Sequence, residues 1–283
     1  MQIVRTISDV RVAREKLGAI ALVPTMGALH QGHLSLIREA HKRAEHVVVS
    51  IFVNPTQFGP KEDFNKYPRP IESDLAKCEE AQVDLVFNPS TEEMYRPSLS
   101  QVVVDLPQLT EVLEGRHRPG HFKGVCQVVA KLFNILTPQI AVFGQKDFQQ
   151  LRVISAMVEA LDWPIGIVGC PTVRESDGLA ISSRNQYLSP DERTRALSIS
   201  RGLMLAQGEI KEGVRQTNRL ITTIRNTLLD PGELGRVPVS IEYVAAVDPT
   251  TLRPVEMLSG PTVLAIAARV GNTRLIDNMT VAP

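Results

Sequence analysis

The sequence has few of the features that mark secreted, membrane-spanning or metal-stapled proteins. Its three cysteines, Cys78, Cys126 and Cys170, lie far apart and form no CxxC pair, so their spacing predicts neither a disulfide framework nor a zinc site. No apolar run approaches the roughly 18 residues of a membrane-spanning helix, and charges interrupt residues 1–17 every few positions. We therefore expect a cytoplasmic protein without a membrane span or a signal peptide.

The chain also lacks an excess of charge of either sign. Lysine and arginine together number 31, as do aspartate and glutamate, and no block of five or six like charges occurs. Nucleic acids and anionic membranes attract strongly basic surfaces, so this balance argues against both as partners. We expect the partner to be a small molecule.

The first part of the chain alternates short apolar runs with helical patterns, such as the spacing of Leu34, Ile37 and Ala40. Continuous apolar strands indicate burial on both faces, which is typical of a parallel sheet covered by helices. We predict a doubly wound, Rossmann-like α/β fold. The alternative, that some runs are buried helix segments, is weakened by their shortness and β-branched content. The predicted strands are residues 19–24, 47–53, 83–89, 139–144 and 165–171.

After about Pro171 the pattern changes. Long helical patterns cover residues 190–229, and strand patterns follow in the C-terminal region at 237–249, 261–270 and 273–278. At 283 residues the chain is long enough for two domains. We predict a Rossmann-like domain over 1–175 and a smaller α+β domain over 176–283.

The stretch VPTMGALHQGH, residues 23–33, follows a predicted strand and opens a predicted helix. Ligands of parallel sheets bind at the carboxyl ends of the strands, where the next helix presents free N–H groups. Gly27 and Gly32 let the backbone approach an anion, and His30 and His33 could each donate a hydrogen bond to a phosphate. The alternative is a pair of capping or surface histidines.

Two further segments also follow predicted strands. In the long loop 53–69, Gln57 is a neutral group suited to hydroxyls or a carboxylate, although an ordinary solvated glutamine is an alternative. In FGQKDFQQ, residues 143–150, Lys146 could bind a phosphate, and Asp147 could cap a helix or bind a ribose hydroxyl or a metal. Gln150 lies one turn further on.

Two polar stretches complete the set. SDGLAISSRN, residues 176–185, carries Ser182, Ser183 and Arg184 and could close over phosphates, or could simply be solvated. GRHRPGHFKGV, residues 115–125, could form a lid over an anion or a solvated loop.

Taken together, these motifs resemble the pantoate–β-alanine ligases, of the HIGH-type nucleotidyltransferase superfamily. The resemblance covers essentially the whole chain and rests on motifs in one order: PTMGALHQGH, FVNPTQF, YPR, RPGHFKGV, FGQKDFQQ, PTVRESDGLAISSRN and TRLIDN. It implies a cytoplasmic homodimer that joins pantoate to β-alanine through a pantoyl adenylate, with magnesium, and converts ATP to AMP and pyrophosphate. The smaller domain would close over the active site of the larger one.

The resemblance also implies residue roles. The catalytic donors would be His30, His33, Lys146 and Arg184, and pantoate and β-alanine would meet Gln57 and Gln150. Many members have glutamate where this chain has Gln145, and some have adjacent aspartates proposed to hold magnesium where this chain has only Asp74. The ATP-binding positions would be Met26, Gly27, Ala28, Leu29, His30, Gln31, Gly32, His33, Gly144, Gln145, Lys146, Asp147, Val173, Ile181, Ser182, Ser183 and Arg184.

Two other functions stay open at this point. A nucleotidyltransferase that stops after nucleotidyl transfer would share the histidine motif but would not need Gln57 and Gln150. A non-catalytic nucleotide-binding or assembly protein could dispense with the transition-state donors His30, His33, Lys146 and Arg184. The reaction products distinguish all three.

Overall fold

The computed structural model describes residues 1–60, 62–230, 232–235 and 237–283. Lys61, in the long loop predicted over 53–69, and Pro231 and Arg236, between the helical patterns over 190–229 and the predicted strand at 237–249, lie outside the described residues. Within that part of the chain, no helix is both long and apolar enough to cross a lipid bilayer.

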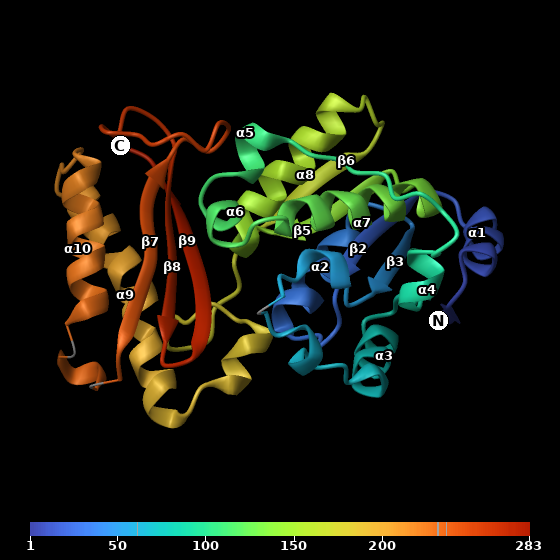
Figure 1. The fold of residues 1–283 in the computed structure, drawn as a ribbon, viewed down its shortest axis with the longest axis horizontal. Helices are drawn as coiled ribbons and strands as arrows, with labels where there is room; N and C mark the ends of the chain where they lie inside the picture. Colours follow the sequence, from blue (N-terminus) through green and yellow to red (C-terminus); the bar gives the residue numbers. More distant parts are fainter. Residues whose placement is uncertain (61, 231, 236) are drawn as a thin grey trace.

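The larger sheet has six parallel strands in the order β1-β4-β3-β2-β5-β6 (Figure 1). The chain winds from β2 through β3 in one direction and through β5 in the other, so the winding reverses between β2 and β5. This is the position where doubly wound sheets bind ligands. The strands are β1 Gln2–Val4, β2 Ile20–Thr25, β3 His46–Ile51, β4 Leu85–Phe87, β5 Ile140–Gly144 and β6 Gly166–Cys170.

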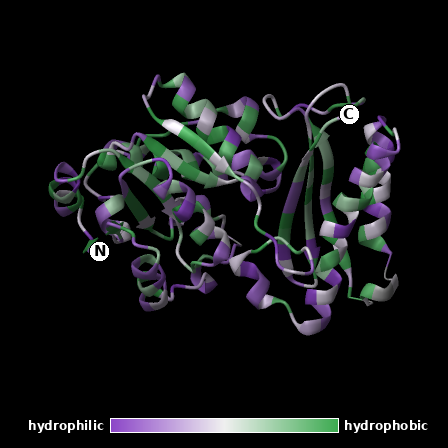
Figure 2. Ribbon diagram, turned by 180° about the vertical axis from the view of Figure 1, so that it is seen from behind, coloured by the Kyte–Doolittle hydropathy of each residue, from purple (hydrophilic) through white to green (hydrophobic). Residues whose placement is uncertain are grey.

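Helices cover both faces of this sheet, as the apolar runs predicted. Ile20 and Leu22 of β2 pack into a core with α1, α7 and α8, whereas Ala21 and Val23 pack into a second core with α2 and α3. Figure 2 shows the resulting pattern, in which the strands are largely hydrophobic and the helices are mixed. The helices of this part are α1 Ile7–Glu15, α2 Gln31–His41, α3 Ile71–Glu80, α4 Thr91–Met94, α5 Pro107–Thr110, α6 Glu114–His117, α7 His121–Leu136 and α8 Phe148–Ala160.

Strand β1 was not among the strands predicted from the sequence. This strand has three residues, lies at the edge of the sheet and buries only Val4, so it carries no continuous apolar run. Short edge strands of this kind take their conformation from the neighbouring strand, here β4, rather than from their own residue pattern.

The second unit is an antiparallel sheet in the order β7-β8-β9 (Val239–Val247, Thr262–Val270, Thr273–Val281). Helices α9 (Pro190–Lys211) and α10 (Thr217–Leu229) cover one face, and the other face meets the first unit (Figure 1). The helical pattern over 190–229 is thus two helices, which separate at Gly213 with φ of 98°. The domain division between residues 175 and 176 stays a prediction.

A buried ion pair joins the two units. Arg274 of β9 donates two hydrogen bonds to the carboxylate of Glu114, at 2.7 and 2.8 Å, and the Tyr243 hydroxyl of β7 donates a third at 2.8 Å. Burial raises the pKa of Glu114, but the Arg274 contacts outweigh burial and leave the pKa below its usual value. Glu114 begins α6 in the first unit, so this contact holds the second sheet against the start of α6.

We predict that Arg274→Ala lowers the free energy of unfolding by about 3–5 kcal/mol, because it leaves the buried Glu114 carboxylate without its ionic partner. The matched control is Arg269→Ala, which removes a half-exposed arginine that contacts Glu242 from the same sheet. The control should cost at most about 1 kcal/mol. Chemical denaturation of both variants measures the difference, and equal losses would contradict the assignment.

Candidate active site

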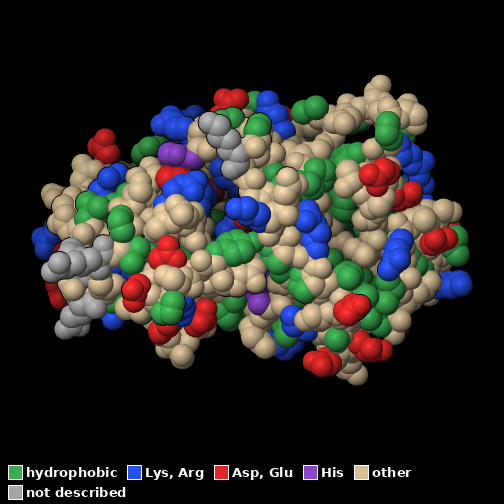
Figure 3. Space-filling model, turned by 60° about the horizontal axis from the view of Figure 1, so that its bottom comes forward, with side chains coloured by type: hydrophobic (Ala, Val, Ile, Leu, Met, Phe, Trp, Pro, Cys, Tyr) green, Lys and Arg blue, Asp and Glu red, His purple; other side chains and the backbone are tan. Residues whose placement is uncertain are grey.

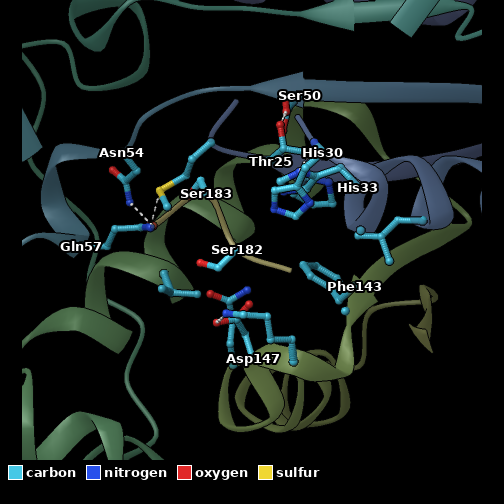
Figure 4. Close-up of a pocket in the computed structure, with 18 of the residues that line it drawn as sticks. Thr25, His30, His33, Ser50, Asn54, Gln57, Phe143, Asp147, Ser182 and Ser183 are labelled. Atoms are coloured by element: carbon cyan, nitrogen blue, oxygen red, sulfur yellow. Dashed lines mark hydrogen bonds and ion pairs between the residues drawn. The ribbon is translucent and has the colours of Figure 1, made fainter. Parts of the chain in front are cut away.

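A cavity of about 230 Å³ opens at the carboxyl ends of β2 and β5, at the point where the winding of the sheet reverses. Segments that are far apart in the sequence meet there (Figure 4). Of the predicted site residues, those that line it are Met26, His30, Gly32, His33, Gln57, Gly144, Lys146, Asp147, Gln150, Val173, Ile181, Ser182, Ser183 and Arg184.

The other predicted site residues do not line this cavity. Leu29 is buried in the core beside α2, and Gln31 and Gln145 are exposed. Gly27 and Ala28 form a tight turn with φ of 82° and 49°, behind the cavity. Asp74, on α3, lies on the far side of that turn.

Helix α3 holds the turn from behind. The Asp74 carboxylate accepts hydrogen bonds from the amides of Ala28 and Leu29, at 2.8 and 2.7 Å, and the Lys77 ammonium donates to the carbonyl of Leu29 at 2.8 Å. A side chain at Gly27 would lie 3.0 Å from Asp74 Oδ2, so the contact also needs a glycine. Each Asp74 oxygen thus already accepts one amide hydrogen, and a role of Asp74 in binding magnesium stays a prediction.

The turn places two histidines, His30 and His33, at the start of α2. Their ring centroids are 4.1 Å apart, and His33 Nδ1 accepts a hydrogen bond from the His30 amide at 3.3 Å. Nδ1 of His33 therefore carries no proton in the neutral ring, and Nε2 becomes the donor. A Cβ at Gly32 would lie 2.9 Å from the His30 ring, so this glycine is a steric requirement of the pair.

Both imidazoles are neutral at physiological pH. Burial, helped by the Lys146 ammonium, lowers the pKa of His30 to about 4. Burial, the His30 ring and Lys146 lower the pKa of His33 to about 3. The pair can therefore donate hydrogen bonds to an anion without itself carrying charge.

Gln57 occupies the other end of the cavity (Figure 4). Its side-chain nitrogen donates to Met26 Sδ at 2.7 Å, and its side-chain oxygen accepts from Asn54 at 3.2 Å. Its backbone carbonyl accepts from His121 Nδ1 at 2.8 Å. A carbonyl can only accept, so the proton of His121 is on Nδ1, and burial lowers the pKa of this ring to about 4.

The backbone of α7 supports this end directly. Asn54 donates to the carbonyl of Gly124 at 3.0 Å, and a Cβ at Gly124 would overlap the backbone of Thr56 and Gln57. The segment 54–57 therefore rests on the helix backbone, with no side chain between them. This close packing fixes the place of Gln57.

Two arginines reach the cavity already paired with acids of the 53–69 loop. Arg118 contacts Glu62 at 2.6 Å, and Arg184 contacts Asp63 at 3.0 Å. Burial raises the pKa of each carboxyl, but the arginine contacts outweigh it and hold both pKa values below the usual range. Lys146 is more weakly paired, because its nearest carboxylate, Asp147, is 3.9 Å away.

No specific role was predicted for Arg118 and His121, and Asn54 and Tyr67 were not among the predicted site residues, although all four line the cavity. His121 is buried, so residues 115–125 are not simply a solvated loop. Asn54 directly follows a predicted strand, and that position was a usable signal. Tyr67 follows no predicted strand, and its contact with Ser183 at 3.5 Å joins residues far apart in the sequence.

The arrangement combines two kinds of recognition in one cavity. One end has neutral imidazole donors and the Lys146 cation, which suit phosphates. The other end has carboxamides, which suit hydroxyls and carboxylates. Such a cavity can hold a nucleotide and an organic acid next to each other, as group transfer between them requires.

Comparisons with known proteins agree with this chemistry. The pantoate-beta-alanine ligase family matches residues 2–280. A pantothenate synthetase of Thermoanaerobacter sp. (strain X514) is 53% identical over 277 residues, covering 96% of both chains. The crystal structure of pantothenate synthetase from Thermus thermophilus is 43% identical with a TM-score of 0.93 over 100% of both chains. A Francisella tularensis pantoate-beta-alanine ligase, complexed with beta-gamma ATP and beta-alanine, is 32% identical with a TM-score of 0.79, covering 99% of this chain and 97% of that one.

The two lowered histidine pKa values predict a pH dependence of stability. Below about pH 6.5 the unfolded chain binds protons at these rings, whereas the folded chain keeps them neutral down to about pH 4. The unfolded state thus binds more protons, so both histidines make the free energy of unfolding fall as the pH falls through this window. Denaturant unfolding at several pH values measures the effect.

The double variant His30→Asn/His33→Asn should show a smaller fall between pH 6.5 and 4. Measurements about one pH unit above this window serve as its control, because any difference there reflects packing rather than protonation. A variant whose stability follows pH as steeply as the unmodified protein would contradict the assignment.

Proposed function

The chain belongs to the pantoate-beta-alanine ligase family and is an enzyme of that class, and on this premise we propose that its reaction runs through a pantoyl adenylate. The carboxylate of pantoate attacks the α-phosphorus of ATP, and pyrophosphate leaves. The amine of β-alanine then attacks the acyl carbon and displaces AMP. The observation that carries this proposal is the neutral His30–His33 pair with Lys146 in the same cavity as Gln57 and Gln150.

The histidine end suits the first step. Negative charge grows on the bridging oxygen and on the departing phosphates as the phosphorus is attacked. Preorganised donors act where this charge develops, which lowers the barrier. His33 offers its Nε2 proton because its Nδ1 is occupied by the His30 amide. Lys146 and Arg184 add positive charge, and Val173 and residues 181–183 line the space available to the nucleotide.

The carboxamides that line the cavity suit pantoate, a small acid with hydroxyl groups. Gln57 and Gln150 bind such groups without adding charge that would misdirect the reacting carboxylate. Because the first step has a free carboxylate as its nucleophile, no covalent bond to the protein is needed, and catalysis consists of positioning and electrostatics. The Francisella tularensis relative was solved with beta-gamma ATP and beta-alanine, which supports the same substrates for this chain.

Magnesium would accompany ATP, as it does in most enzymes that use this nucleotide. Mg²⁺ keeps several waters and binds substrate phosphates, often with one or two carboxylates. Among the described residues, no group of three His, Cys, Asp or Glu side chains could form a protein cage for it. The ion would thus neutralise charge on the phosphates, and nothing in the donor set assigns it a protein ligand.

A homodimer is the proposed assembly. Leu99, Val102 and Val103 have exposed fractions of 61, 72 and 66%, the highest among the large hydrophobic side chains of the described residues. The three residues lie close together in the sequence, within 99–103, and exposed apolar side chains that gather on a surface are typical of a protein interface. The face of the molecule in Figure 3 mixes both signs of charge, and with equal numbers of basic and acidic residues in the chain this fits small-molecule substrates rather than nucleic acid.

We predict that the protein catalyses exchange of labelled pyrophosphate into ATP when magnesium and pantoate are present and β-alanine is absent. Reversal of the first step needs no amine, so label enters ATP as soon as the adenylate forms. Leaving out pantoate should abolish the exchange, and adding β-alanine should release AMP and pantothenate.

The alternatives give other results. A non-catalytic nucleotide-binding protein would exchange nothing, and a ligase that makes an acyl phosphate would release ADP. A nucleotidyltransferase that stops after the first step would exchange label but release no pantothenate on addition of β-alanine. Exchange that required β-alanine would rule out the two-step scheme.

We also predict that Gln57→Ala and Gln150→Ala weaken the use of pantoate far more than the binding of ATP. A hydrogen bond to a buried group costs about 1–3 kcal/mol when one partner is removed, which corresponds to about 5- to 150-fold in apparent affinity. Kinetic titration with pantoate and calorimetry with ATP measure the two effects. Gln207→Ala, on α9 away from the cavity, is the control. Loss of ATP affinity with normal pantoate kinetics would refute the assignment.

A further inference from the structure

The closing motif TRLIDN, residues 273–278, contributes polar contacts to three segments that lead to the active site. Besides the Arg274 contact with Glu114, Asp277 accepts from Arg174 at 2.6 and 3.0 Å. Arg174 directly follows Val173, which lines the cavity. Asn278 reaches the turn that carries Lys146. Strand β9 therefore touches the machinery of the first unit repeatedly, and no role for these residues follows from the reaction itself.

Asn278 makes the most specific of these contacts. Its side-chain nitrogen donates to the carbonyl of Gln145 at 3.0 Å and to the carbonyl of Lys146 at 2.8 Å. Both carbonyls belong to the single 3₁₀ turn Gln145–Asp147, which joins β5 to α8. One amide group thus uses its two hydrogens to fix two consecutive peptide planes, and these planes set the direction in which the Lys146 side chain leaves the backbone.

Asn278 is itself firmly held. It is buried, and it pairs with Ala265 of the central strand β8. Its amide donates to Asp277 Oδ1 at 2.8 Å, and the same carboxylate holds Arg174. The donor is therefore held by contacts within its own sheet that are separate from its contacts with the turn.

We propose that Asn278 is a positioning residue for Lys146, through which the second sheet fixes the cation that faces the phosphates. The proposal rests on the function proposed above. A lysine has a flexible side chain, so its reach into the cavity depends on where its backbone stands. In a reaction driven by positioning, a shift of about 1 Å can cost about 100-fold in rate. The alternative is that Asn278 serves only to pack the two units against each other.

The variants Asn278→Ala and Asn278→Asp separate these two roles. Aspartate keeps the size of the side chain but replaces the donor with an acceptor that faces two carbonyls. We expect both variants to lower the turnover of pantoate-dependent pyrophosphate exchange by about 10- to 100-fold, with the KM for pantoate changed by less than about 3-fold. Asn226→Ala, an exposed asparagine of α10, is the control and should behave as the unmodified protein. If Asn278→Asp exchanged pyrophosphate as fast as the unmodified protein, the proposal would be overturned.

A double-variant cycle with Lys146→Ala gives the decisive measurement. If Asn278 acts through Lys146, its substitution should cause no further loss once the lysine side chain is gone. A role in packing alone would lower turnover by the same factor in both backgrounds, and that result would also overturn the proposal. The same cycle can be measured without turnover. Calorimetry gives the dissociation constant of ATP for the unmodified protein, the two single variants and the double variant. Thermal unfolding identifies the folded variants, and Asn278→Asp replaces Asn278→Ala in the cycle if the alanine variant does not fold.

The proposed function and the role of Asn278 can be refuted separately. Absence of exchange in the unmodified protein would refute the proposed function. Exchange in the unmodified protein, together with an additive cycle, would refute only the role of Asn278.

Discussion

The turn after β2 depends on two side chains of α3, and the rest of the active site depends on that turn. Ala28 has a positive φ of 49°, a conformation that costs an ordinary residue about 1 kcal/mol or more. Asp74 and Lys77, which lie one helical turn apart, bind the amides and a carbonyl of this turn and so offset the strain. These contacts from α3 fix the start of α2. They thereby fix the packing of the two histidine rings and leave the Nε2 proton of His33 free to donate.

Charge in the cavity follows a similar logic. A buried cation needs a partner, and the 53–69 loop supplies Glu62 and Asp63 to Arg118 and Arg184. The two histidines avoid the energetic cost of burying a charge because they remain neutral. Lys146 is the cation with the weakest internal pairing among these groups, which explains why its placement by a neighbouring strand matters for the phosphates.

Much of this arrangement could be predicted from the sequence, because parallel strands place their carboxyl ends at one edge. The apolar runs before Met26, Gln57 and Lys146 were predicted as strands of that sheet. The three residues that follow these strands do meet in the cavity. What could not be predicted are the contacts made across long separations. Asp74 was expected near a metal, yet its partners lie 45 and 46 residues away, and no spacing rule indicates them. The pairing of Arg184 with Asp63 spans 121 residues and depends on how two loops fold over each other.

The contact between Gly124 and the Gln57 segment limits how this protein can be engineered. Replacing a glycine within a helix by alanine usually raises stability by up to about 1 kcal/mol, and such exchanges are a common choice in thermostabilisation. Here the added methyl group would push against the backbone that carries Gln57. A scan that scores only helix propensity would thus select the change that displaces a substrate contact, whereas Gly208, with open space around its Cβ position, offers the same gain without that penalty.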